Sequence, residues 1–240
     1  MKANVIVFEA SVFIAFSVFY QGARMALGTS RNRTFFIGSL LFSLAIHTAA
    51  VLGGVMDFYW YANNSYYKHY PLGGYIIWLG LVPLAACLLF YMITAASYLS
   101  ASLLFSKPGI WLRSAVAGLI ALGFYLMIEP VAVTNHWWSW NLKSFYIIDI
   151  PVLALIGVFA SVFFFTTAFQ ITAVEFLDPR FLNAIEKKTI KRWPLKTEKP
   201  AGSLSWKHLQ ALFLFRLVLA LLAFGAVVAP LMALLWAVAN

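Results

Sequence analysis

Apolar residues gather along the chain into six long runs that polar connections separate. A helix that crosses the hydrocarbon core of a membrane needs about 20 predominantly apolar residues. The runs that meet this length cover residues 5–27, 35–56, 72–105, 110–133, 147–174 and 209–238. The pattern predicts an all-α integral membrane bundle of about six transmembrane helices, and at most seven segments, in a single domain over residues 1–240.

The first and third of these runs allow more than one interpretation. The first could be read as a signal peptide, but it is too long for one and contains Glu9. The third, over residues 72–105, is longer than one crossing requires. We expect it to be tilted or to extend beyond the membrane, with a kink at Pro83.

Composition supports a membrane protein. Of the 240 residues, 63% are hydrophobic and only 10% are charged, whereas soluble domains carry about 25% charged residues. The single cysteine, Cys87, excludes a disulfide within the chain and a cysteine-based metal site. The sequence also lacks a Walker loop, a dinucleotide fingerprint and the histidine spacing of di-iron membrane oxygenases. We therefore expect neither a metal nor another cofactor.

The positive charges predict the orientation. Most of the 17 lysine and arginine residues lie in three connections, at residues 24–33, 107–113 and 180–207. Because basic loops stay on the cytoplasmic side, we expect a multi-pass plasma membrane protein with both termini outside. Residues 175–208 would form a basic cytoplasmic connection that meets anionic membrane lipids. The net charge of +9 thus reflects topology, and we expect no nucleic-acid partner.

A few ionisable residues lie within the predicted spans or at their ends, where they are costly and often mark a functional site. They are Glu9, His47, Asp57, Glu129 and Asp149. The predicted topology places all of them in the outer half, around one polar pocket, and leaves the inner half apolar. Glu129 is the strongest candidate because Pro130 follows it and frees local backbone groups. The others also fit plainer roles: Asp57 and Asp149 at the interface, Glu9 in a structural pair, and His47 in packing.

Two aromatic clusters flank this predicted pocket, at residues 57–70 and 136–140. Their members include Trp60, Tyr61, His136, Trp137, Trp138 and Trp140. They fit either an interfacial aromatic belt or the entrance for a long flat ligand. In the second interpretation these residues and His47 bind the substrate.

The sequence from Ile128 to Trp140, IEPVAVTNHWWSW, resembles the Glu-Pro-Val-x-Val…Trp-x-Trp signature of the carotenoid-biosynthesis membrane family, which includes bisanhydrobacterioruberin hydratase and related carotenoid hydratases. Three further stretches are similar: Gly53 with residues 58–61, residues 82–84, and residues 150–151 followed by Gly157. The resemblance covers about residues 47–160. The chain differs from the family pattern at Tyr125, Ala154 and Val158.

The resemblance implies that water is added across a terminal C=C bond of a carotenoid-like or polyprenyl lipid. Such a reaction begins when a neutral carboxylic acid protonates the alkene, and aromatic faces can stabilise the resulting cation. Glu129 would be the proton donor, with Asp57, Glu9 or Asp149 positioning water. The tryptophans of the second cluster would form an aromatic wall.

Two other classes of function stay open at this point. The protein could bind a carotenoid or another lipid without catalysis, which needs the aromatic clusters but not a protonatable Glu129. It could also be a proton-coupled transporter, which would need polar residues along a whole path through the bundle.

Overall fold

The computed structural model describes residues 3–58, 75–104, 109–135, 137–141, 146–147, 150–175 and 206–239. Within these ranges, six helices are long and apolar enough to cross a membrane. They are α1 (Ala3–Leu27), α2 (Thr29–Leu52), α3 (Leu84–Leu104), α4 (Ile110–Thr134), α5 (Val152–Glu175) and α7 (Trp206–Ala239). The predicted all-α membrane bundle is therefore confirmed.

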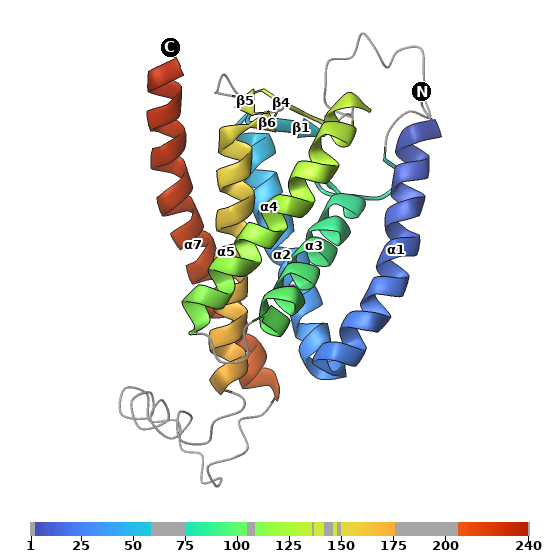
Figure 1. Ribbon diagram of the computed structural model, residues 1–240, viewed down its shortest axis with the longest axis vertical. Helices are drawn as coiled ribbons and strands as arrows, with labels where there is room; N and C mark the ends of the chain where they lie inside the picture. The colour runs from blue at the N-terminus through green and yellow to red at the C-terminus, as the bar shows by residue number, and fades with distance from the viewer. Residues whose placement is uncertain are drawn as a thin grey trace, which may run out of the picture.

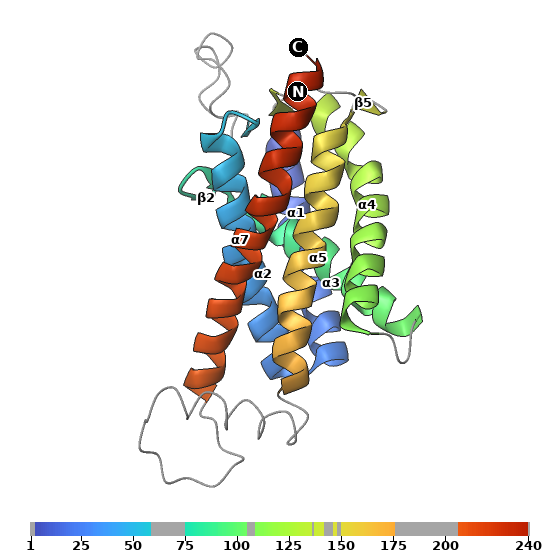
Figure 2. The same ribbon diagram turned by 90° about the vertical axis from the view of Figure 1, so that its left-hand side faces the viewer.

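The helices stand side by side, and the chain reverses direction between them (Figure 1). Gly28 alone links α1 to α2, with a φ of 82° that favours glycine. This link lies at one end of the bundle, which we call the turn end. The two chain termini lie at the opposite end, which we call the strand end. In the bundle α3 packs against α1, α2 and α4, while α5 packs between α4 and α7 (Figure 2).

Short strands form three two-stranded antiparallel sheets among the described residues. The strands are β1 (Met56–Phe58), β2 (Trp78–Leu79), β3 (Val82–Pro83), β4 (Trp138–Trp140), β5 (Tyr146–Ile147) and β6 (Ile150–Pro151). β1 pairs with β4, so that Asp57 lies opposite Ser139. This pairing brings parts of the two aromatic clusters together at the strand end.

The third predicted span is wrong at its beginning. α3 begins at Leu84, and Pro83 lies in β3 instead of kinking a helix. Gly80 has a φ of 64° in the turn that joins β2 to β3, a conformation that glycine readily adopts. Proline has no amide hydrogen and fits immediately before a helix better than within it. In the same way, α5 begins after Pro151, later than predicted.

The interior of the turn half is also more polar than expected. Phe35 packs its ring edge-on against Phe165, with centroids 5.0 Å apart, but polar side chains are buried in this half as well. Gln170 donates a hydrogen bond from Nε2 to Ser114 Oγ at 2.8 Å, and Ser97 is fully buried. The prediction of an apolar inner half is therefore wrong. The reason is that small hydroxyl groups and one amide fit between the helices, although they do not stand out in a hydropathy pattern.

Candidate functional site

Glu129 lies near the end of α4 and is fully buried. The indole Nε1 of Trp138 donates to both carboxylate oxygens at 3.0 Å, and that of Trp140 donates to Oε1. The hydroxyl group of Tyr125, one helical turn earlier, is also hydrogen-bonded to Glu129. We call these four residues the Glu129 cluster. In this structure the carboxyl group accepts hydrogen bonds from all three of these donors.

The local sequence explains how two indoles reach one carboxyl group. Successive side chains of a strand point to opposite faces, so Trp138 and Trp140 share a face of β4 and Ser139 points away. Pairing with β1 holds β4 across the end of the bundle. Tyr125 and Glu129 are four residues apart on α4 and therefore lie on the same side of the helix.

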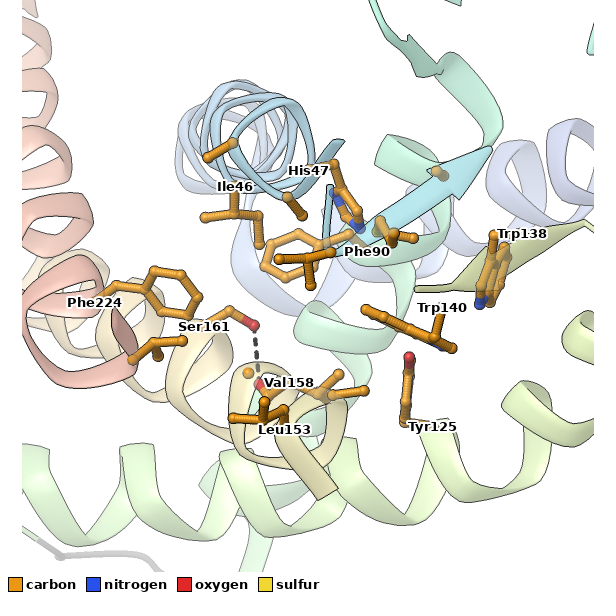
Figure 3. Close-up of a pocket in the computed structure, with 18 of the residues that line it drawn as sticks. Ile46, His47, Phe90, Tyr125, Trp138, Trp140, Leu153, Val158, Ser161 and Phe224 are labelled. Carbon is orange, nitrogen blue, oxygen red and sulfur yellow. Dashed lines mark hydrogen bonds between the residues drawn. The ribbon is translucent and has the colours of Figure 1, made fainter. Parts of the chain in front are cut away.

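A cavity of about 290 Å³ lies beside this cluster. Its walls come from α2, α3, α4, α5 and α7, together with β1 and β4. Most lining side chains are aliphatic or aromatic, and Figure 3 shows several of them converging on one space. The lining residues with polar side-chain atoms are His47, Tyr125, Ser161 and the two tryptophans of the Glu129 cluster. Such an apolar pocket with a few polar groups is typical of small-molecule sites.

The cavity reaches the side of the bundle. Ala49 of α2 and Gly225 and Ala229 of α7 line it and are also exposed. A Cβ atom built at Gly225 would meet no atom within 4 Å, whereas at Gly38 it would contact the ring of Phe213. Thus α7 packs tightly against α2 near the turn end and leaves space nearer the strand end. Because the flank of a membrane bundle faces lipid, the opening faces the bilayer.

His47 extends from α2 into this cavity (Figure 3). Its Nδ1 lies 2.8 Å from the backbone oxygen of Ser43 and 3.0 Å from the Ser43 hydroxyl. A carbonyl oxygen can only accept, so the neutral ring carries its proton on Nδ1 and a lone pair on Nε2. Among the described residues, Nε2 has no hydrogen-bond partner.

Glu9 does not line the cavity, although it is buried. Its carboxylate accepts hydrogen bonds from the backbone amides of Ile76 at 2.7 Å and Ile77 at 3.1 Å. Burial and the negative charge of Glu9 raise the pKa of the neighbouring Tyr75. Glu9 therefore has a structural role: it fixes the segment before β2 against α1.

Asp57 and Trp137 also lie away from the cavity wall. Asp57, in β1, accepts a hydrogen bond from Asn141 Nδ2 at 2.5 Å. Trp137 stacks on Phe8 of α1, with ring centroids 3.8 Å apart. Four other predicted site residues, Asp149, Trp60, Tyr61 and His136, lie outside the described residues.

The structure thus brings together His47, Glu129, Trp138 and Trp140 from the predicted site and leaves Glu9, Asp57 and Trp137 outside it. It adds Tyr125 and Ser161, which the sequence analysis did not select as site residues. The sequence did hold a signal for Tyr125: it precedes a membrane-embedded glutamate by four residues, a spacing that places both side chains on one side of a helix. Ser161 carries no such signal, because a lone serine in an apolar helix is unremarkable in sequence.

Within the described ranges, no group of three or more His, Cys, Asp or Glu residues could hold a metal ion. Comparison of the chain with protein-family models, with curated proteins and with solved structures finds no match.

Proposed function

We propose that this protein binds one end of a long apolar, isoprenoid-like molecule within the plasma membrane. The observation that supports the proposal is the apolar cavity beside the Glu129 cluster, open toward the bilayer. At about 290 Å³ it is at the small end of ligand pockets. An end group would therefore occupy the cavity while the remaining length lies between the helices and lipid.

The reaction that we propose is hydration of a terminal C=C bond. A proton adds to the less substituted carbon, the π electrons form the new C–H bond, and a tertiary cation results. Water then forms a C–O bond with the cation and loses a proton, which restores the acid. Tyr125 lines the cavity and contacts Glu129. When Glu129 is protonated, its O–H would donate to the Tyr125 oxygen, and the Tyr125 O–H would turn to the alkene. Tyr125 would then pass its proton to the alkene carbon and take the proton of Glu129 in return. The rings of Trp138 and Trp140 would stabilise the cation.

One observation favours binding without catalysis as a second candidate. Glu129 does not line the cavity itself, and its partners Trp138, Trp140 and Tyr125 all donate to it. Such contacts are expected of a carboxylate whose role is structural and that holds β4 against α4. In this case the Glu129 cluster shapes the wall of a lipid-binding site and transfers no proton.

Proton-coupled transport is a third candidate. The buried polar side chains of Ser97, Ser114 and Gln170 supply polar groups in the half of the bundle that was expected to lack them. None of these three residues lines the cavity, so this candidate has less support than the first two.

Expression in a lycopene-making bacterium tests the proposal. We expect the purified protein to retain a polyene, detected by absorbance and mass spectrometry, and the cells to contain a hydrated carotenoid. Glu129→Gln and Tyr125→Phe should each reduce the hydrated product at least tenfold while the polyene stays bound. Tyr98→Phe is the matched control, because Tyr98 lies on α3 outside the cavity wall.

The outcomes separate the candidates. A retained polyene without any hydrated product would support binding alone. Unchanged hydration in Glu129→Gln would remove Glu129 from the mechanism. A protein that carries no isoprenoid but takes up a solute into vesicles with a proton gradient would contradict the proposal in favour of transport.

A further inference from the structure

We propose that His47 recognises a hydroxyl group, so that the cavity prefers a ligand whose end is an alcohol. The inference rests on the proposed function, because it takes the cavity as the site of an isoprenoid-like ligand. It singles out the hydroxylated form of the ligand, a prenyl alcohol or a polyene with a hydroxylated end, as the form that the cavity prefers over the unhydrated chain.

Five side chains on the cavity wall carry hydrogen-bond donors. Tyr125, Trp138 and Trp140 direct their O–H or N–H groups to Glu129. The Ser161 hydroxyl donates to the backbone oxygen of Val158 at 2.9 Å, as the dashed line in Figure 3 shows. His47 uses its Nδ1 proton on the Ser43 oxygen. Every side-chain donor on the described wall is therefore already engaged while Glu129 accepts these hydrogen bonds.

One hydrogen-bond acceptor on the described part of the cavity wall lacks a partner. Nε2 of His47 keeps its lone pair toward the cavity and has no partner among the described residues. The ring is also packed against Phe58, with centroids 5.8 Å apart, so it is held in place on the wall. An acceptor left unpaired in an apolar space is unfavourable. The occupant of the cavity must then donate a hydrogen bond to it.

A lipid could offer several kinds of end group to this wall. A hydrocarbon end donates nothing, and ketones, ethers and esters are acceptors that would find no free donor on this wall. An ammonium group could donate, but it would need a free negative charge, and the Glu129 carboxyl group already accepts from three residues. A hydroxyl group satisfies Nε2 and adds no charge.

The inference also fits the proposed reaction. Water that waits for the cation can donate one hydrogen to Nε2, and the alcohol that forms can donate in the same direction. Because His47 lines the cavity and Asp57 and Glu9 do not, His47 would be the residue that positions water.

A binding experiment on the full chain in lipid nanodiscs tests the inference. Geranylgeraniol and its methyl ether have the same chain, but only the alcohol can donate. We expect the wild-type protein to bind the alcohol at least tenfold more tightly than the ether. His47→Phe should abolish this preference by weakening alcohol binding alone. His47→Gln, which can offer an amide oxygen, should keep part of the preference and serves if the phenylalanine variant fails to fold.

Equal affinity of the wild-type protein for both compounds would overturn the role of His47 while leaving the lipid site in place. A preference that persists unchanged in both His47 variants would also overturn it. If neither compound binds, the proposed function fails and this inference fails with it.

Discussion

Two buried glutamates, Glu9 and Glu129, each accept hydrogen bonds that hold a helix to a segment at the strand end. Glu9 of α1 accepts hydrogen bonds from the amides of Ile76 and Ile77, and Glu129 of α4 accepts them from two indole groups. Each glutamate connects a helix to a segment at the strand end. A carboxylate in a membrane span is costly unless it is paired, and each of these has paired with donors that the chain itself supplies. Only the Glu129 cluster also forms part of the cavity wall.

We expect Glu9→Gln to loosen the segment before β2. The amide has one acceptor oxygen in place of two, and its NH₂ group would face a backbone N–H. Hydrogen bonds to charged groups contribute about 1.5–3 kcal/mol each, so a loss of that order is expected. Hydrogen exchange at Ile76 and Ile77 measures it, and Ser17→Ala is the control, since that hydroxyl bonds only within α1. Unchanged protection of both amides would contradict the structural role of Glu9.

At the scale of elements, glycines mark where helices touch and where they separate. At Gly118 of α4, a Cβ atom would lie 2.8 Å from the ring of Phe159, so α4 and α5 pack closely there. At Gly157 of α5 and Gly225 of α7, both on the cavity wall, a Cβ atom would meet nothing within 4 Å. The cavity therefore exists because α5 and α7 have glycines in the strand half, and no side chain fills the space beside them.

This arrangement predicts that Gly157→Leu fills the cavity without unfolding the protein. The larger side chain enters open space, and glycine is about 1 kcal/mol less favourable in a helix than the best helix formers. We expect the amount of polyene that copurifies to fall at least tenfold. Gly123→Leu is the matched control, because Gly123 is exposed on α4 and lies outside the cavity wall. Full retention of polyene by folded Gly157→Leu would show that the ligand binds elsewhere.

At the scale of the whole molecule, both termini lie at the strand end and the α1–α2 link lies at the turn end. An even number of spans requires this arrangement. The candidate site belongs to the strand half, and the basic residues Arg24, Arg31 and Arg113 lie near helix ends in the turn half. If the positive-inside rule applies, the cavity opens into the outer leaflet.

Cysteine labelling tests this orientation. Ile147 is exposed in β5 at the strand end, and Ser30 is exposed at the turn end. An impermeant maleimide should label Ile147→Cys on intact cells and Ser30→Cys only after permeabilisation. The native Cys87 is buried and should contribute little background. The reverse pattern of labelling would place the site on the cytoplasmic side.

The amino-acid sequence by itself determined the six spans and the most important site candidates. Both follow from local properties: span length follows from hydropathy, and Glu129 and His47 stand out because ionisable residues are rare in membranes. The short strands before α3 and α5 were not predicted, since an apolar hairpin and an apolar helix end look alike in hydropathy. Pro83 and Pro151 were the local signals of those boundaries.

Only the tertiary structure decided which candidates share a site. Glu9, Asp57 and Glu129 are equivalent as acidic residues in the outer half. Glu9 and Asp57 find their partners in segments that are distant in sequence, whereas the indole partners of Glu129 follow it by nine and eleven residues. Only the fold shows which of the three lies beside the cavity. The cavity, the role of Tyr125 and the free Nε2 of His47 depend on how α2, α4, α5 and α7 pack. Hydropathy is a property of each residue, whereas a cavity is a property of the space that several helices leave between them.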